Sequence, residues 1–283
     1  MIKITPEEFK VMSTYIYGLT GIYLDATKGY LVESRFDSLL RETGCSNYSE
    51  LYFKAKSDPT KVLPRKIIDA ITTNETLFFR DTSPFELLQH KILPDLIDKR
   101  SKGASKFAGT SLRIWSAASS TGQEIYSIAI VLRELLGPDF LKYNIRLLGT
   151  DISDQAVATA SKGIYGKIEI GRGLPQDKLQ KYFTTVPEGW KIKDELRAMA
   201  TFRNMNLMDD FSSLGKFDIV LCRNVAIYFN EADKIKLFSK IQKVLEPDGY
   251  LLIGSTESIS GIAPQFESKR YLRAVFYQLK GAS

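Results

Sequence analysis

The sequence is poor in the side chains that hold metals and disulfides. Its 283 residues include two cysteines, Cys45 and Cys222, and a single histidine, His90. Two cysteines far apart in the sequence predict neither a disulfide framework nor a zinc site, and they indicate a reducing compartment. His90 has no partner histidine or carboxylate motif, so we expect it to pack or to face solvent. The expectation is a cytoplasmic protein that binds no metal.

Long apolar runs are also absent, which argues against membrane insertion. No run approaches the roughly 20 apolar residues that cross a bilayer, and the first dozen or so residues lack the pattern of a secretory signal. The formal net charge of +6 is modest and the basic residues are scattered, so the sequence does not indicate a nucleic-acid partner. An acidic protein partner fits this charge equally well. The length allows one large domain or two smaller ones.

The stretch 111–137 is the one around which the rest of the chain is organised. An apolar run is followed by a turn of small residues and then by an amphipathic run that starts at Glu124. This pattern predicts a strand, a tight loop and a helix. In an open α/β sheet such a loop lies at the carboxyl end of a strand, where ligands bind. Because the loop has one glycine rather than three, it does not support a nucleotide-phosphate site.

Strand-like and helix-like segments alternate from residue 112 onward. This alternation predicts a mostly parallel sheet with helices on both faces, the doubly wound α/β class. Residues 271–279 predict an antiparallel strand at the sheet edge. Pro247–Gly249 predicts a turn before a strand, and Pro94 should bend or interrupt its helix. The predicted strands are 112–117, 145–150, 217–222 and 250–254, and the predicted helices are 83–100, 124–136, 153–162 and 231–245.

Residues 1–71 predict a helical N-terminal domain, and residues 72–283 predict the α/β domain. Thr5 followed by Pro6 is a typical helix start. Arg35 and Arg41 fall on the second predicted helix, where they form either a solvated face or a docking face for acidic helices. The helices after the first are expected over 28–42, 48–56 and 62–72.

The alternation is interrupted between residues 165 and 207. A helix is expected over 174–182, and a turn at Pro187–Gly189 lies among short strand-like pieces. We interpret the segment from about residue 165 to 205 as a small antiparallel β insertion. Its exposed edge would recruit an extended peptide, or the insertion is a lid or padding. The strand-like pieces are 184–186, 190–193 and 200–202.

Three polar segments lie where ligands are expected. Residues 72–81, TTNETLFFRD, change from small polar to doubly aromatic side chains. They fit either a ligand lining or a helix cap with a hydrophobic anchor. Asp151 follows a strand, where an acidic residue commonly binds ribose hydroxyls, although Asp151 or Ser153 could merely cap the next helix. Residues 223–229, RNVAIYF, follow another strand at the same end.

Taken together, five stretches resemble one family, the CheR chemotaxis-receptor methyltransferases. The resemblance extends through nearly the whole chain, and the motifs occur in the family's order. The resemblance implies a class I S-adenosylmethionine-dependent methyltransferase: a Rossmann-like doubly wound sheet with an all-α N-terminal domain and a small antiparallel β insertion. The five stretches are TTNETLFFRD (72–81), IWSAASSTGQEIYSIAI (114–130), GTDIS (149–153), FRNMNL (202–207) and CRNVAIYF (222–229).

The resemblance also implies the reaction. A protein-glutamate O-methyltransferase would move a methyl group from S-adenosylmethionine to glutamates on the helical signalling domain of methyl-accepting chemotaxis receptors. The products would be glutamate 5-O-methyl ester and S-adenosylhomocysteine, and the purpose would be sensory adaptation. We expect a monomer in the bacterial cytoplasm that docks on the receptor through its N-terminal domain, with Arg35 and Arg41 as candidate contacts.

Carried over residue by residue, the family pattern assigns a donor site and a reaction site. Arg80 and Tyr228 match the residues assigned to the reaction. Glu124 matches the contact to the methionine portion and Asp151 matches the ribose ligand, while Asn206 and its neighbour match the adenine contacts. The implied donor contacts are Asn74, Thr76, Arg80, Glu124, Asp151, Asn206, Leu207, Arg223 and Asn224.

The sequence departs from the family pattern at positions that carry none of these key groups. Gln123 replaces a glutamate, which lowers the negative charge near a cationic sulfonium. Gly189 stands alone where some members have a glycine-rich turn that binds a receptor's C-terminal peptide, so we expect no such tether. The other departures are Ser119, Ile125, Ala226 and Asp248.

Methyl transfer to a carboxylate suits these residues. A glutamate is ionised at pH 7, since its reference pKa is about 4.3, so no strong base is needed. Positioning alone contributes on the order of 7–11 kcal/mol. Arg80 can orient the carboxylate, and Tyr228 can donate one hydrogen bond to it.

Two other functions fit the same fold. One is a donor-sensing module that methylates nothing, and the other is a methyltransferase that acts on a small molecule. The presence of both Arg80 and Tyr228 favours an enzyme over a sensor. The helical N-terminal domain favours a protein acceptor, because a small acceptor needs no docking surface.

Overall fold

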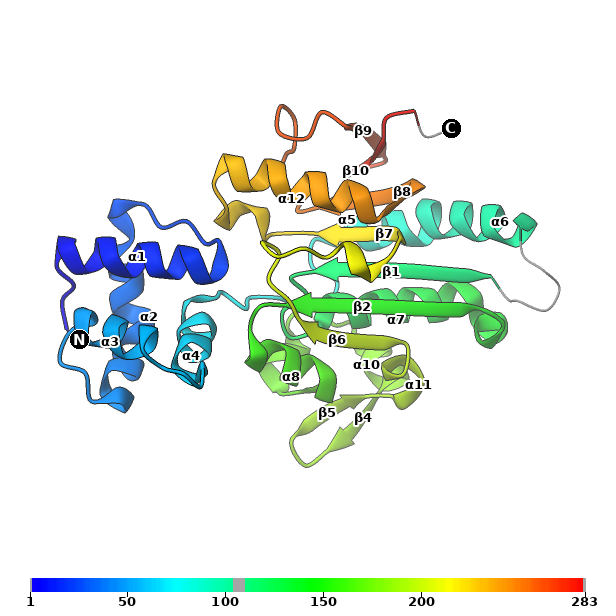
Figure 1. The fold of residues 1–283 in the computed structure, drawn as a ribbon. Helices are drawn as coiled ribbons and strands as arrows, with labels where there is room; N and C mark the ends of the chain where they lie inside the picture. Colours follow the sequence, from blue (N-terminus) through cyan, green and yellow to red (C-terminus); the bar gives the residue numbers. More distant parts are fainter. Residues whose placement is uncertain (1, 104–109, 282–283) are drawn as a thin grey trace.

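The structure, a computed structural model, describes residues 2–103 and 110–281. A seven-stranded sheet with helices on both faces forms the larger part, and a group of four helices lies beyond one end of its strands (Figure 1). This architecture confirms the predicted doubly wound α/β class with an all-α N-terminal region and a small antiparallel sheet. Within the described residues, no helix is both long enough and apolar enough to cross a membrane.

The N-terminal helices enclose a hydrophobic cluster of their own, separate from those of the sheet. Thr5 and Glu8 form a capping box at the first helix, in which each side chain accepts a hydrogen bond from the other residue's N–H. Met12, Ile16 and Phe36 are fully buried in the cluster. The helices are α1 (Pro6–Thr20), α2 (Gly29–Thr43), α3 (Tyr48–Lys56) and α4 (Val62–Ile71), with a 3-10 turn at Ala26–Lys28.

The large sheet has the strand order β6-β2-β1-β7-β8-β10-β9. The first five strands of this order run parallel, and β10 is antiparallel to both of its neighbours. The order reverses between β1 and β7, which creates the crevice where open α/β sheets bind ligands. The strands are β1 (Ser111–Ala117), β2 (Asn144–Asp151), β6 (Ala200–Asn204), β7 (Phe217–Cys222), β8 (Leu245–Ile253), β9 (Phe266–Tyr271) and β10 (Ala274–Leu279).

Both faces of the central strands are buried, which explains their continuous apolar character. Along β1, Leu112 and Ile114 join the cluster that contains α5, α6 and α7, whereas Trp115 and Ala117 join the cluster that contains α12. The helices of this part are α5 (Ser83–Leu87), α6 (Leu93–Gly103), α7 (Gln123–Leu136), α8 (Asp154–Lys162) and α12 (Glu231–Val244).

The small sheet is antiparallel and has the order β3-β5-β4. The prediction that residues 200–202 belong with these strands was wrong, since they lie in β6, which pairs parallel with β2 in the large sheet. A run of three residues does not reveal its pairing partner, so only the tertiary structure decides it. The elements here are β3 (Ile164–Tyr165), β4 (Phe183–Val186), β5 (Gly189–Ile192), α9 (Lys167–Gly171), α10 (Gln176–Tyr182) and α11 (Asp194–Arg197).

Two local predictions need correction, and a third, the interruption of a helix near Pro94, is confirmed. Pro247–Gly249 lies inside β8 rather than before it, at a register shift where β8 has extra residues opposite β7. The predicted strand 271–279 corresponds to β10, whose antiparallel pairing is confirmed, but Tyr271 ends the unpredicted β9, which forms the sheet edge outside it. The helix predicted over 83–100 contains a π-helical turn at Leu88–Ile92 just before Pro94. Proline cannot donate a helical hydrogen bond, and the wider turn accommodates that loss.

Candidate active site

The main cavity lies between the sheet and the N-terminal helices. The carboxyl ends of β1, β2 and β7 point toward those helices (Figure 1), and the cavity at this end has a volume of about 480 Å³. Its lining comes from both sides, with Ile22–Asp25 contributed by the segment after α1, residues 71–76 by the link between the two parts, and most of the remainder by the strand ends. Position and size are those of a small-molecule site at a topological switch point.

All the residues that the sequence assigned to the site line this one cavity. They come from five segments that are far apart in the chain, and most are partly exposed to the cavity. They are Asn74, Thr76, Arg80, Glu124, Asp151, Asn206, Leu207, Arg223, Asn224 and Tyr228.

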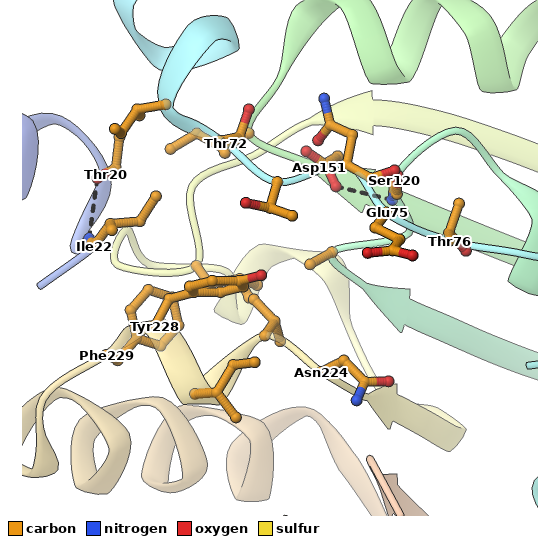
Figure 2. Close-up of a pocket in the computed structure, with 18 of the residues that line it drawn as sticks. Thr20, Ile22, Thr72, Glu75, Thr76, Ser120, Asp151, Asn224, Tyr228 and Phe229 are labelled. Carbon is orange, nitrogen blue, oxygen red and sulfur yellow. Dashed lines mark hydrogen bonds between the residues drawn. The ribbon is translucent and has the colours of Figure 1, made fainter. Parts of the chain in front are cut away.

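Asp151 forms one wall of the cavity, opposite Tyr228 (Figure 2). Its carboxylate accepts hydrogen bonds from the N–H groups of Ser120 and Ser153, each at 2.9 Å. Burial of the carboxylate outweighs these bonds and raises the pKa of Asp151 above its ordinary value. The cap of α8 is Ser153, whose hydroxyl accepts from the N–H of Ala156, so Asp151 remains available to the cavity.

The Asp151 wall is tied to the N-terminal helices through Ser153. The hydroxyl of Ser153 donates to Asp69 Oδ1 at 2.7 Å and accepts from Asn74 Nδ2 at 3.4 Å. Asp69 belongs to α4, and the N–H of Gln155 also donates to it. Movement of the helices therefore displaces this wall.

The segment 72–81 has one half at the cavity and the other half in the hydrophobic core. Its polar half lines the cavity, and the carbonyl of Asn74 accepts a hydrogen bond from the hydroxyl of Ser120 at 2.8 Å. Its aromatic half is an anchor: Phe78 is fully buried and lies edge-on to Tyr165 and Phe183, with ring centroids 5.0 and 5.6 Å away. The anchor holds the polar half at the mouth of the cavity.

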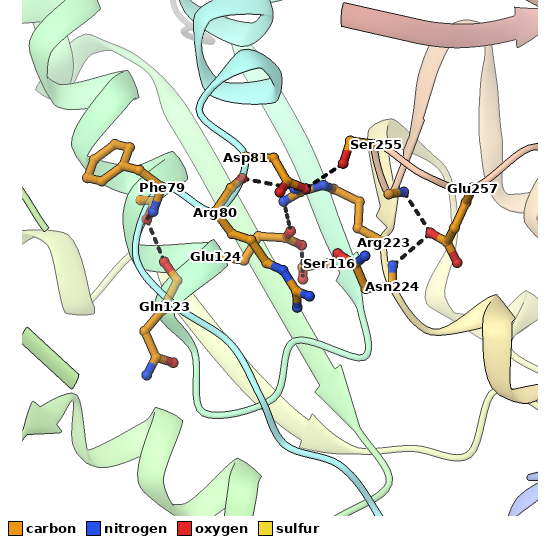
Figure 3. A network of polar contacts seen from close by, with 12 residues as sticks. Phe79, Arg80, Asp81, Ser116, Gln123, Glu124, Arg223, Asn224, Ser255 and Glu257 are labelled. Carbon is orange, nitrogen blue, oxygen red and sulfur yellow. Dashed lines mark hydrogen bonds and ion pairs between the residues drawn. The ribbon is translucent and has the colours of Figure 1, made fainter. Parts of the chain in front are cut away.

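Arg223 is the centre of a buried network (Figure 3). Only 1% of its side chain is exposed, and its guanidinium pairs with Glu124 at 2.6 Å and with Asp81 at 2.8 Å. It also donates to the carbonyl oxygen of Arg80 at 2.9 Å. The second oxygen of Glu124 accepts from the hydroxyl of Ser116 at 2.7 Å. Arg223 thus fixes both the main chain of Arg80 and the carboxylate of Glu124.

Among the described residues, the guanidinium of Arg80 donates one hydrogen bond to the cavity wall. Its Nη1 donates to the carbonyl oxygen of Glu75 at 3.1 Å. The Glu75 carboxylate pairs with Arg172 at 2.7 Å, and the hydrogen bond from Arg172 lowers the pKa of Glu75. A guanidinium carries five N–H donors, so Arg80 retains donors for a ligand.

Sequence reasoning missed the contribution of the segment after α1. The N–H of Tyr23 donates to the carbonyl of Tyr228 at 2.9 Å, and Asn206 donates to the carbonyl of Leu19 at 3.0 Å. Gly21 permits this close approach: its φ is +76°, and an added Cβ would lie 2.5 Å from Cγ of Met208. A glycine just after a predicted helix was the one available signal.

Comparison with known families decides the identity. The family model described as "CheR methyltransferase, SAM binding domain" matches residues 74–274, and "CheR methyltransferase, all-alpha domain" matches residues 7–72. The chain belongs to the CheR methyltransferase family. It is therefore an S-adenosylmethionine-dependent methyltransferase, and the residues that line the cavity fall mostly within the range matched by the SAM-binding domain.

Curated CheR relatives match over nearly their full length. The chain is 37% identical to the chemotaxis protein methyltransferase Cher2 of Pseudomonas putida, over 96% of this chain and 98% of the relative. It is equally similar to chemotaxis protein methyltransferase 1 of Pseudomonas aeruginosa, with the same coverage. The enzyme of Vibrio parahaemolyticus is 37% identical over 99% of both chains.

The residues of the cavity fit S-adenosylmethionine. The buried Asp151 carboxylate offers acceptors for a pair of ribose hydroxyls. Glu124 offers a carboxylate for a cationic amino group, and Leu207 with Met205 offers apolar surface for a flat base. A cavity of about 480 Å³ is in the range that small cofactors occupy.

Proposed function

We propose that this enzyme methylates glutamate side chains on the signalling domain of chemoreceptors, forming the 5-O-methyl ester and S-adenosylhomocysteine. Membership of the CheR family supports the methyltransferase activity, the donor and the role in chemotaxis. The observation that carries the choice of acceptor is that Arg80 and Tyr228 line the same cavity as the donor residues. A cation and a phenol together suit a carboxylate acceptor.

The donor is held along the strand ends. Asp151 binds the ribose hydroxyls, Glu124 binds the methionine portion, and Asn206 with Leu207 contacts the adenine. Asn74 and Thr76 close the other side of the donor, while Arg223 and Asn224 complete the pocket. The Arg223 network supports these roles, because it fixes Glu124 at a set position before any ligand arrives.

The acceptor carboxylate approaches between Arg80 and Tyr228. The guanidinium of Arg80 orients one face of the carboxylate, and the Tyr228 hydroxyl donates to one of its oxygens. The other oxygen forms the new bond to the methyl carbon as the bond from methyl to sulfur breaks, with the electron pair going to sulfur. Enclosure of the site excludes water.

Residues 1–71 form the receptor-docking domain, and residues 72–283 form the catalytic domain with its β insertion. Arg41, whose side chain is 75% exposed and paired with Asp37, is available to an acidic helix. Arg35 instead donates to the Thr72 carbonyl at 3.3 Å and to the Thr73 hydroxyl at 3.1 Å. We therefore assign receptor docking to the α2 face around Arg41. Arg35 keeps its assigned part in docking and, in addition, contacts the segment that links the two domains. The enzyme acts as a monomer in the cytoplasm, where the signalling domains are.

The test combines binding and transfer. Calorimetric titration with S-adenosylmethionine and S-adenosylhomocysteine measures the donor site, and tritiated-methyl transfer to receptor signalling domains measures the reaction. We expect micromolar binding and base-labile label on receptor glutamates. Binding without transfer to any receptor glutamate would replace this proposal with a donor sensor. Absence of binding would overturn the donor site itself.

A further inference from the structure

Three large apolar side chains are exposed at the cavity. Tyr23, Tyr30 and Ile227 are 59%, 63% and 55% exposed, and all three line the cavity. We call these three side chains the apolar rim. Single exposed apolar residues are ordinary on a protein surface, but several gathered around one cavity mark a binding surface.

Two members of the rim are joined directly to the residue that we place at the reaction, and the third lines the same cavity. Ile227 directly precedes Tyr228 in the 3-10 turn Ala226–Tyr228. Tyr23 is joined to Tyr228 by the main-chain hydrogen bond of 2.9 Å. Tyr30 lies in the first turn of α2. The rim therefore draws side chains from both the helical part and the sheet part.

We propose that the apolar rim recognises the acceptor, by packing against apolar side chains that lie one helical turn from the target glutamate. This inference rests on the proposed function, in which the acceptor is a glutamate on a receptor helix. A side chain that reaches Arg80 and Tyr228 brings its own helix surface onto the rim. On a helix, the residues three and four positions away share the face of that side chain.

The rim determines which side chains are accepted beside the target glutamate on the receptor helix. Its three side chains carry no formal charge, and two of them end in a hydroxyl that can stay in water while the ring is buried. A small or apolar neighbour buries the rim without losing hydration. A charged neighbour would lose water and gain no charged partner from the rim side chains, which is unfavourable. The enzyme thus selects among surface glutamates by the side chains beside them.

Docking onto the rim also prepares the reaction. Tyr23 and Ile227 flank Tyr228, so a helix that covers them closes the cavity over the acceptor carboxylate. Removal of water strengthens the interaction of that carboxylate with Arg80. A rim made of smaller polar side chains would leave this path to solvent open.

The test replaces rim residues and compares them with equally exposed residues elsewhere. Tyr23→Ser, Tyr30→Ser and Ile227→Ser are measured singly and together, with Leu272→Ser and Val275→Ser, at positions 72% and 44% exposed and away from the cavity, as controls. We expect each rim variant to raise the KM for the receptor about fivefold and the triple variant to raise it further. The controls should keep the wild-type KM, and thermal melts confirm that each variant is folded.

A receptor variant separates this inference from the proposed function. In the receptor, the apolar residue three or four positions from a methylated glutamate is changed to lysine. With the wild-type enzyme, we expect this receptor variant to have a much higher KM than the unchanged receptor. With the triple rim variant of the enzyme, the same receptor change should raise the KM by a smaller factor. If the wild-type enzyme methylates receptor glutamates but the rim variants keep its KM, the rim inference is overturned and the function stands. If the wild-type enzyme binds the donor and methylates no receptor glutamate, both are overturned.

Discussion

The main-chain N–H of Tyr23 donates a hydrogen bond to the main-chain carbonyl of Tyr228 at 2.9 Å. Tyr23 follows the first helix of the N-terminal part, whereas Tyr228 follows a central strand of the sheet. Close by, the hydroxyl of Tyr17 donates to Asp233 at 2.5 Å. These contacts hold the segment that carries Tyr228 against α1. The placement of Tyr228 therefore depends on how the N-terminal helices are seated.

Tyr17→Phe tests this dependence. The change removes the bond to Asp233 and the one that the Tyr17 hydroxyl accepts from Asn230 Nδ2 at 3.1 Å. Asn230 caps α12, which starts just after Tyr228. We expect kcat to fall about fivefold, equivalent to about 1 kcal/mol, with donor affinity nearly unchanged. Steady-state rates and calorimetry check this, with Tyr271→Phe at the sheet edge as the control. A loss confined to donor affinity would contradict it.

Arg80→Ala and Tyr228→Phe test the reaction itself. Arg80→Ala should lower kcat by about a hundredfold, the usual effect of removing one charge-stabilising donor, while part of the donor affinity survives. Tyr228→Phe should lower kcat with little change in donor affinity, because it removes only the hydroxyl. Initial rates of methyl transfer and binding of S-adenosylhomocysteine separate the two effects. Unchanged turnover in the Arg80 variant would remove that residue from the mechanism.

Lys240 holds the loop that carries Leu207, and its replacement should weaken donor binding. Its ammonium donates to the carbonyls of Leu207 at 2.6 Å and Asp209 at 2.7 Å, and burial lowers its pKa. Lys240→Met keeps the length of the side chain but loses both bonds. We expect the KM for the donor to rise about tenfold, since each such bond contributes about 1 kcal/mol or more. Lys243→Met, exposed on the same helix, is the control. A fall in kcat alone would exclude this role.

We expect Asp151 to set the acid limit of donor binding. Its pKa is raised by burial, so the folded protein takes up a proton at a pH above the ordinary 3.8. As the pH falls through this raised pKa, we expect donor affinity to fall, because a protonated carboxyl accepts hydroxyl bonds less well. Between 3.8 and the raised pKa, the empty folded protein binds more protons than the unfolded chain, so its stability decreases as the pH rises.

Asp151→Asn isolates this effect. Donor affinity should fall about tenfold or more at neutral pH, the magnitude of a lost charge-assisted hydrogen bond. The fall in donor affinity on acidification should disappear. Calorimetry at a series of pH values between 3.8 and neutral checks both expectations, with the exposed Asp139→Asn as the control. An unchanged pH profile in the Asp151 variant would assign the acid limit to another group.

Arg223→Met should destabilise the fold. It leaves the carboxylates of Asp81 and Glu124 without their shared cation, and loss of one partner from a buried pair costs about 3–5 kcal/mol. Urea denaturation measures the free energy of unfolding, with Arg41→Met as a surface control expected within about 1 kcal/mol of wild type. Adding Glu124→Gln should recover part of the loss. A double variant no more stable than Arg223→Met would show that the charge of Glu124 is not the cause.

The elements that could be predicted are those with a strong local pattern. The periodicity after Glu124 gave α7 to within one residue, and the Thr5–Pro6 pair marked the start of α1. Asp151 and residues 223–229 could be placed at the site because they follow strands, and the carboxyl ends of parallel strands meet at one edge of a sheet. Asp151 and Arg223 come together for this reason. Asn74, Thr76, Arg80, Asn206 and Leu207 could be assigned only through the resemblance to the family.

The strand pairings and site contacts that could not be predicted depend on contacts between distant segments, which no local sequence pattern encodes. β6 carries the same short alternating pattern whether it pairs with β2 or with β5. The bond from Tyr23 to Tyr228 uses main-chain atoms, which leave no trace in the side chains. Lys240 resembles any other lysine of an exposed helix until the loop at Leu207 folds over it. Such contacts need the tertiary structure.

The cavity is divided between the cluster of the N-terminal helices and those of the sheet. A ligand that contacts both sides adds a third surface to their interface. Binding of the ligand and packing of the helices are thermodynamically linked. The free energy that the ligand gains from its contacts with the helices therefore also stabilises the packing of the helices against the sheet. S-adenosylhomocysteine lacks only the transferred methyl group, so it can make nearly all the same contacts. The bound product should therefore stabilise the packing of the two parts about as much as the bound donor does. On the proposed donor site, we therefore expect both compounds to hold the two parts together more tightly than in the empty enzyme.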